Sequence, residues 1–223
     1  MMIDIEKYIT KLIQLLSQSF GDRLIYVGLQ GSYLRGEATP QSDVDIMVVI
    51  DELRVQDLTT YRTTIQTLEH FDRSCGFICS KRDIVSWNPL EIGHLLNTTK
   101  DYYGTLCGLV PAYTETDMRN FVKMSVNNLY HEIAHRYIHA NYDKNVANLP
   151  RSYKSVFFIL QNLYYLTHGK FVNTKAELLS KLDGKDHAVL KHAIEMNQYS
   201  VYNFEENFTL LFEWCQNVLQ RLA

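Results

Sequence analysis

The spacing of apolar residues changes character about halfway along the chain. In the first part, apolar positions at helical spacing alternate with short, compact apolar runs that are rich in β-branched residues. The first pattern is typical of amphipathic helices and the second of buried strands. The elements predicted in chain order are a helix over 5–20 ended by Gly21, a strand over 24–29, a strand over 44–50, a helix over 58–68 and a strand over 75–79. This order predicts an α/β unit.

From Pro89 onward we find no strand pattern and only helical spacing. The predicted helices cover 116–140, the segment between Pro150 and Gly169, a segment after Thr174 and a last one that opens near Asn203. Pro150 suits the first turn of a helix, and Gly169 suits its end. The sequence therefore predicts an all-α bundle after the α/β unit, with the boundary near Pro111.

Composition restricts the classes of function. Of the 223 residues, 46% are hydrophobic, which is enough for a real core, and the formal net charge is −3. Without a basic balance, the chain is not expected to bind long nucleic acid. No apolar run approaches the ~18 residues that span a membrane. The four cysteines form no CxxC pair, so we expect buried, reduced thiols and a cytoplasmic protein.

Two acidic residues lie two positions apart at the start of the second predicted strand. Because side chains alternate along a strand, Asp43 and Asp45 leave the same face, while Val44 points into the core. Asp is depleted in strands, and two neighbouring carboxylates raise each other's pKa unless a cation lies between them. A divalent cation with oxygen ligands removes both costs. The alternative is a strand edge blunted by charge.

A Gly-Ser turn follows the first predicted strand. Gly31 lets backbone N–H groups approach an anion closely, and Ser32 adds a hydroxyl donor. Arg35, one helical turn further on, is placed to contact a phosphate oxygen. The turn and the acid pair together predict a phosphate cradle opposite a metal pair.

The stretch GSYLRGEATPQSDVDIMVV resembles the nucleotidyltransferase superfamily that includes DNA polymerase beta, and in particular its bacterial small-molecule and minimal members. Ten residues separate Ser32 from Asp43, as in that family's Gly-Ser and Asp-x-Asp pattern. The resemblance implies an α/β (α+β) catalytic domain with a small mixed sheet over 1–110 and a substrate-binding helical bundle over 111–223. The combination of a catalytic α/β half with a helical bundle is similar to the antibiotic-modifying members of the family.

The resemblance also implies a reaction. Asp43 and Asp45 would hold two Mg²⁺ ions, and Gly31, Ser32, Arg35 and Ser42 would bind the nucleoside triphosphate. A hydroxyl of a small acceptor, an antibiotic being one example, would attack the α-phosphorus and expel pyrophosphate. The oligomeric state stays open, with a homodimer as one alternative.

A third carboxylate is usual in this family, and the third predicted strand contains none. Asp83 is one candidate, provided that the strand continues to it; alternatively, Ser80 caps a helix with Asp83 at its third position. Asp72, before the strand, is a weaker candidate. Glu132, in the helical half, is a further candidate for the base.

The predicted helix over 116–140 contains His131-Glu132-x-x-His135, and His139 extends the stripe. This pattern matches the zincin motif, which makes a zinc hydrolase an alternative. The histidines lie on the side opposite the apolar face. That side is therefore either a solvated surface or the source of a group that deprotonates the acceptor. Another alternative for the whole chain is a non-catalytic, antitoxin-like interaction protein that retains the fold.

Overall fold

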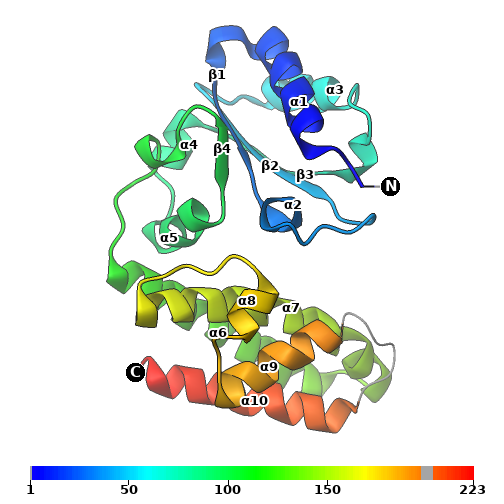
Figure 1. The fold of residues 1–223 in the computed structure, drawn as a ribbon, viewed down its shortest axis with the longest axis vertical. Coiled ribbons are helices and arrows are strands. Elements are labelled where there is room, and N and C mark those ends of the chain that lie inside the picture. Colours follow the sequence, from blue (N-terminus) through cyan, green and yellow to red (C-terminus); the bar gives the residue numbers. More distant parts are fainter. Residues whose placement is uncertain (1, 197–202) are drawn as a thin grey trace. The chain divides into compact units, whose positions relative to one another are not determined.

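The computed structural model describes residues 2–196 and 203–223. The chain divides into two compact units, the first ending at Tyr113 and the second beginning at Thr114 (Figure 1). Among the described residues, the first unit holds the four strands and the second is helical.

A four-stranded mixed sheet forms the centre of the first unit. Its strands are β1 (Leu24–Leu29), β2 (Val44–Ile50), β3 (Ser74–Ser80) and β4 (Lys100–Tyr103), in the order β3-β2-β1-β4. β2 pairs with β3 in parallel, whereas β1 pairs with β2 and with β4 in antiparallel. The predicted small mixed sheet is therefore confirmed.

Helices cover both faces of this sheet (Figure 1). Alternate residues of β2, beginning with Val44, pack with α1 (Ile5–Phe20) and α3 (Val55–Ile65). The other set, Met47 and Val49, packs with residues of α4 (Lys81–Val85) and α5 (Pro89–Asn97). Both faces of β2 are thus buried in the core, which explains its nearly continuous apolar sequence. Three short 3-10 turns complete the unit: Gly21–Arg23, Phe71–Arg73 and Leu106–Gly108.

The expectation that strands end before Pro89 is wrong, because β4 lies beyond it. β4 is an edge strand of four residues that pairs with β1 only. It carries no buried residue, so it leaves no apolar run in the sequence. The tertiary partner, and not local pattern, makes this segment a strand.

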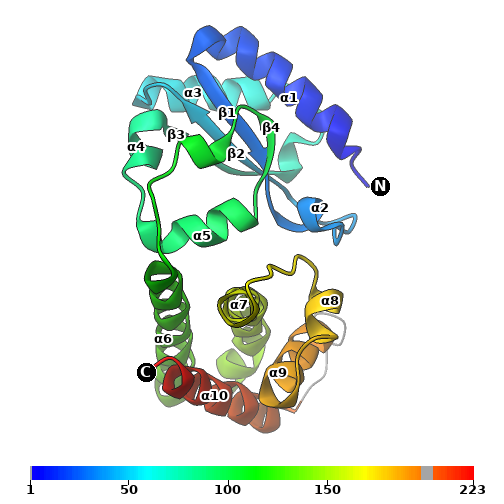
Figure 2. The same cartoon turned by 60° about the vertical axis from the view of Figure 1, so that its left-hand side comes forward.

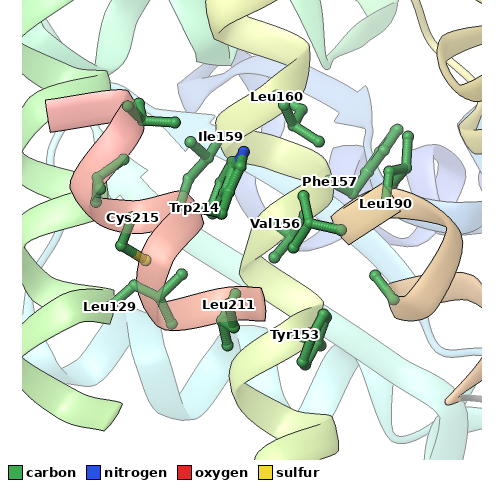
Figure 3. Close-up of a cluster of buried hydrophobic side chains, with 14 of the residues drawn as sticks. Leu129, Tyr153, Val156, Phe157, Ile159, Leu160, Leu190, Leu211, Trp214 and Cys215 are labelled. Carbon is green, nitrogen blue, oxygen red and sulfur yellow. The ribbon is translucent and has the colours of Figure 1, made fainter. Parts of the chain in front are cut away.

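The second unit is built from five helices in the part of the chain that the structure describes (Figure 2). They are α6 (Glu115–His139), α7 (Tyr142–His168), α8 (Lys175–Leu179), α9 (Gly184–Glu195) and α10 (Phe204–Arg221). α6, α7, α9 and α10 pack around one apolar core. Trp214 lies in this core and is fully buried, with Leu211, Leu160 and Val156 around it (Figure 3).

The helix that contains Pro150 begins earlier than predicted. α7 starts at Tyr142, with the Asn141 side chain accepting from the backbone N–H of Lys144, so Pro150 lies inside the helix. The predicted end at Gly169 is confirmed, in a left-handed conformation. The cost of an internal proline is offset by burial of Leu149, Tyr153 and many other residues of this helix.

The cysteines differ in part from expectation. Cys79 and Cys215 are buried, but Cys75 and Cys107 are exposed, and all four are free. Within residues 2–196 and 203–223, no helix has both the length and the apolar character needed to cross a membrane.

Candidate active site

The Gly-Ser turn follows the end of β1, and the acid pair lies at the start of β2. Because the two strands are antiparallel neighbours, the turn and the acid pair lie next to each other. The Gln30 N–H donates to the backbone oxygen of Asp45 at 2.9 Å, which joins the turn to the second strand. Gly31 has φ +70°, and a β-carbon there would lie 1.9 Å from Oδ2 of Asp45. Only glycine fits this backbone against the carboxylate. The predicted cradle and the predicted metal pair are thus in direct contact.

A short helix, α2 (Gly31–Arg35), follows the turn and carries the cradle residues. Its end is fixed because the Glu37 N–H donates to the backbone oxygen of Ser32 at 2.9 Å. The Ser32 hydroxyl has no hydrogen-bond partner among the described residues and is available to a phosphate oxygen. The Arg35 Nε donates to Glu37 Oε2 at 3.0 Å. A phosphate contact from Arg35 therefore competes with, or adds to, this ion pair.

The loop between α2 and β2 is held by hydrogen bonds within the loop and by Arg73, which lies 31 residues beyond Ser42. The Ser42 hydroxyl accepts from the Thr39 N–H at 2.8 Å, and the Ser42 backbone oxygen accepts from Arg73 Nε and Nη2 at 3.1 and 2.6 Å. Ser42 thus stabilises the turn that leads into the acid pair. Its predicted contact with the nucleotide stays a prediction.

The two carboxylates lie in different environments. Asp43 is exposed and Asp45 is half-buried. Burial raises the pKa of Asp45 above its ordinary value, and the negative charge of Asp43 raises it further. The hydrogen bond from Cys75 and the positive charge of Arg35 act in the opposite direction. Without a cation, the pair is therefore held in a conformation that costs free energy.

Cys75 lies next to Asp45 on the neighbouring strand. The parallel register of β2 and β3 pairs Asp45 with Cys75, and the thiol donates to the carboxylate. Burial and the charge of Asp45 raise the pKa of Cys75. Sequence analysis missed this residue, because the register of parallel strands cannot be inferred from local pattern.

The structure assigns Asp83 a capping role. The Ser80 hydroxyl accepts from the Asp83 N–H, and the Asp83 carboxylate accepts from the Ser80 N–H, at 3.1 and 3.0 Å. Hydrogen bonds from Ser80 lower the pKa of Asp83. Of the two alternatives weighed for Asp83, the geometry is that of the helix cap. Asp72 lies in the 3-10 turn Phe71–Arg73 and is exposed.

The sequence pattern does not identify Asp101 as a further acid on the sheet, because it does not predict the strand β4 that carries this residue. Asp101, on β4, pairs with Gly28 and accepts from the Tyr26 hydroxyl at 2.7 Å. Paired residues leave the same face of a sheet, so Asp101 shares a face with Asp45. Its hydrogen bond with Tyr26 gives it a structural partner.

Glu132 in the second unit also has fixed partners. The Arg136 guanidinium donates to its carboxylate, and so does the Ser152 hydroxyl, the latter at 3.0 Å. No group of three histidine, cysteine or acidic side chains arranged for a metal occurs among the described residues. The His131-Glu132-x-x-His135 segment thus lacks the third ligand of a zincin site. Glu132 as a base stays a prediction.

The acid pair suits Mg²⁺ by its chemistry. Mg²⁺ is usually held by one or two carboxylates, with substrate phosphates and water completing the shell. Asp43 and Asp45 supply two carboxylates on one face, and burial together with the charge of Asp43 raises the pKa of Asp45, so a cation beside the pair would be stabilising. The donor set therefore fits a divalent cation that arrives with a phosphorylated substrate.

Comparison with known proteins adds independent findings. Residues 9–91 match the family model described as a nucleotidyltransferase domain. No curated protein matches the chain. Among solved structures, the spectinomycin adenyltransferase AAD(9) from Enterococcus faecialis, with ATP and spectinomycin, is similar with a TM-score of 0.62 at 16% identity. That match covers 96% of this chain and 99% of the other, and it shows a shared fold.

Two further solved structures are more distant. A nucleotidyltransferase-like protein from Exiguobacterium sibiricum has a TM-score of 0.39 at 14% identity, covering 97% of this chain and 75% of that one. A toxin-antitoxin with AMP-PNP has a TM-score of 0.33 at 23% identity, covering 58% of this chain and 92% of that one.

Proposed function

We propose that this protein transfers a nucleoside monophosphate from a nucleoside triphosphate to a hydroxyl of a small acceptor. Pyrophosphate is the second product. The match of residues 9–91 to the family model described as a nucleotidyltransferase domain supports this proposal. The observation that carries the proposal is the contact between Gly31 and Asp45, which joins a phosphate cradle to an acid pair.

Each part of the first unit has a role in this reaction. Asp43 and Asp45 would hold Mg²⁺, which would supply positive charge to the triphosphate and to the leaving pyrophosphate. The backbone at Gly31 and the Ser32 hydroxyl bind and orient the phosphate tail. The β1–β2 junction keeps both groups in fixed positions, so that catalysis rests on positioning and charge stabilisation.

The proton of the acceptor hydroxyl needs a destination. Asp45 is the carboxylate on this site whose pKa is raised, but its role as a ligand leaves it little capacity to take a proton. Glu132, in the second unit, is the base that we propose. Its hydrogen bonds with Arg136 and Ser152 fix the carboxylate in one orientation.

The acceptor is proposed from the fold match. AAD(9), whose structure contains ATP and spectinomycin, is matched over 96% of this chain. A small hydroxyl-bearing antibiotic is therefore the first acceptor class to test, with ATP as the first nucleotide. We assign domains 1–110 and 111–223 to catalysis and acceptor binding on the same basis.

The test follows pyrophosphate release. The full chain is incubated with Mg²⁺, each of the four nucleoside triphosphates in turn, and a panel that contains spectinomycin and other hydroxyl-bearing antibiotics. We expect acceptor-dependent release that falls by at least about a thousandfold in Asp43→Asn with Asp45→Asn, the loss expected when the main charge stabilisation is removed. Asp22→Asn, an exposed acid in the turn before β1, is the matched control.

Binding is measured alongside turnover. Mg²⁺ with a nucleoside triphosphate should raise the unfolding temperature of the wild-type chain but not that of the double variant. Absence of a shift with every nucleotide would refute the proposal. A shift without turnover on any acceptor would retain nucleotide binding and favour the interaction protein.

A further inference from the structure

A pocket lies within the second unit, where α6 ends and α7 begins, and of its lining residues the proposed transfer uses only Glu132. Its volume is about 730 Å³, within the range of small-molecule sites. It is lined by His131, Glu132, His135, Arg136, His139, Ala140, Asn141 and Lys144.

The acidic charge of this pocket is already neutralised. Glu132 is the one acid among its lining residues, and its carboxylate is bound by the Arg136 guanidinium and the Ser152 hydroxyl. Arg136 Nη1 also donates to Ser152 Oγ at 2.9 Å. The ion pair of Glu132 and Arg136 therefore presents almost no net charge to a ligand in the pocket.

The other basic groups of the pocket have no such partner. The side chains of His131, His135, His139 and Lys144 are exposed, and none forms a hydrogen bond or an ion pair with the residues that the structure describes. The three imidazoles follow one another along α6, with ring centroids 5.9 and 4.6 Å apart. Asp143, the nearest acid in the sequence, is not among the lining residues.

The helix dipoles do not decide the sign of the preferred ligand. The C-terminus of α6 and the N-terminus of α7 both lie at the pocket, so their partial charges oppose each other. The side chains decide it, and they are donors. Arg136 and Lys144 disfavour a bare metal cation, and no three-ligand metal group exists within residues 2–196 and 203–223.

The length of the donor row indicates the size of the anion. From His131 to His139 the row extends over about 12 Å of helix axis, too long for one carboxylate or one phosphate to contact throughout. We propose that this pocket binds a small molecule that carries a di- or triphosphate group. Imidazole and ammonium donors form charge-assisted hydrogen bonds with its oxygens.

The experiment titrates sodium pyrophosphate, tripolyphosphate and ADP into the full chain at constant ionic strength. EDTA is present, so that the Asp43 and Asp45 site holds no metal and does not contribute. We expect saturable binding by calorimetry, and changes in the imidazole NMR signals of His131, His135 and His139. The signals of His168, which stacks on Tyr164 elsewhere in the unit, should not change.

Single variants locate the ligand. His135→Gln and Lys144→Gln should each weaken tripolyphosphate binding about tenfold, as expected for one hydrogen bond to a charged group. Lys154→Gln, an exposed lysine on α7 outside the pocket, should leave the affinity unchanged. All three positions are on the surface, and circular dichroism verifies that each variant is folded.

Several results would overturn the proposal. These are the absence of saturation in the millimolar range, equal weakening in Lys154→Gln, and unchanged affinity in both pocket variants. In a separate titration without EDTA or polyphosphate, stoichiometric Zn²⁺ binding that is lost in His135→Gln would assign the histidines to a metal instead. A single-stranded RNA that binds more tightly than tripolyphosphate and competes with it would assign the surface to nucleic acid. Tighter binding of ADP than of pyrophosphate supports a nucleotide ligand, and the reverse supports a free polyphosphate.

Discussion

The backbone of Gly31 and the carboxylate of Asp45 occupy adjoining space, with no room for a β-carbon between them. A β-carbon at Gly31 would lie 1.9 Å from Oδ2 of Asp45. The proposed triphosphate cradle and the proposed metal ligand are therefore one structural element, contributed by two segments that are 14 residues apart. A change in either one displaces the other.

Gly31→Ala separates this contact from ordinary backbone strain. Gly36 is the matched control, because its φ of +69° equals that of Gly31 within a degree while a β-carbon there meets nothing within 4 Å. Both substitutions should cost about 1–2 kcal/mol of stability, since alanine disfavours positive φ. Gly31→Ala should in addition reduce turnover by about a hundredfold or more, because it displaces Asp45. Equal turnover of the two variants, measured by pyrophosphate release, would contradict the proposed geometry.

The raised pKa of Asp45 predicts how pH changes stability. A carboxyl whose pKa is higher in the folded state binds its proton more tightly there, so the stability of the metal-free protein should fall as pH rises from the ordinary value through the folded one. Above that range Mg²⁺ should restore stability, by about 2.7 kcal/mol at a hundred times its dissociation constant. Thermal unfolding with and without Mg²⁺ measures both effects. In Asp43→Asn with Asp45→Asn, neither should remain.

Cys75 is the position from which a third carboxylate would reach the proposed metal site. Because the register places it beside Asp45, Cys75→Asp should strengthen Mg²⁺ binding by about tenfold, or ~1.4 kcal/mol. The same variant should be less stable than wild type in EDTA, since a third carboxylate adds like charge. Cys75→Ser and Cys107→Ser, the latter at another exposed cysteine, should leave Mg²⁺ affinity near that of wild type. Calorimetric titration of Mg²⁺ distinguishes these outcomes, and weaker binding by Cys75→Asp would argue against this position.

An ion-pair network anchors the far end of β1 and β2. Arg23 donates to Asp51 and to both oxygens of Asp57, at 2.9, 2.8 and 3.1 Å. The hydrogen bond from Arg23 lowers the pKa of Asp57. A lowered carboxyl pKa contributes stability above the ordinary value of about 3.9, and that contribution is lost as pH falls toward the folded value.

Asp57→Asn tests this network. The wild type should lose more stability than the variant between about pH 5 and pH 3, the range around the ordinary aspartate pKa. Denaturant unfolding at each pH provides the measurement. Asp22→Asn, an acid outside the network, should retain the wild-type pH dependence; parallel curves for Asp57→Asn and wild type would show that the pair does not contribute.

The sequence predicts best the elements with strong local patterns. β1, β2, α1 and the end of α7 at Gly169 lie where apolar spacing and glycine placed them. β4 was missed because its four residues depend on pairing with β1. The start of α7 was misplaced because a proline was read as a beginning, whereas the buried face of the helix continues on both sides of it.

In the candidate site, too, some residues are predicted by a local sequence motif and others depend on tertiary pairing. The local motif placed Gly31 and Asp45, whose contact needs only one strand junction. Cys75 and Asp101 come from neighbouring strands, and only the strand order and register place them on the same face. The spacing of Ser80 and Asp83 fits both a continued strand and a capped helix, so only the structure shows that Asp83 belongs to a helix cap.

The central position of β2 in the sheet determines which parts of the site unfold locally and which tolerate substitutions. β2 pairs on both sides, with β1 and with β3, so its amides should exchange hydrogen only when the whole first unit unfolds. The loop over 36–42 is outside the sheet and is held by hydrogen bonds within the loop and, at Ser42, by Arg73, so its amides should exchange through smaller openings than those of β2. Asp45, on β2, and Asp43, directly before it, should therefore stay in place for as long as the first unit is folded, whereas the loop beside them can move and accept substitutions. New substrate preferences can arise in the loop while the carboxylates stay in place.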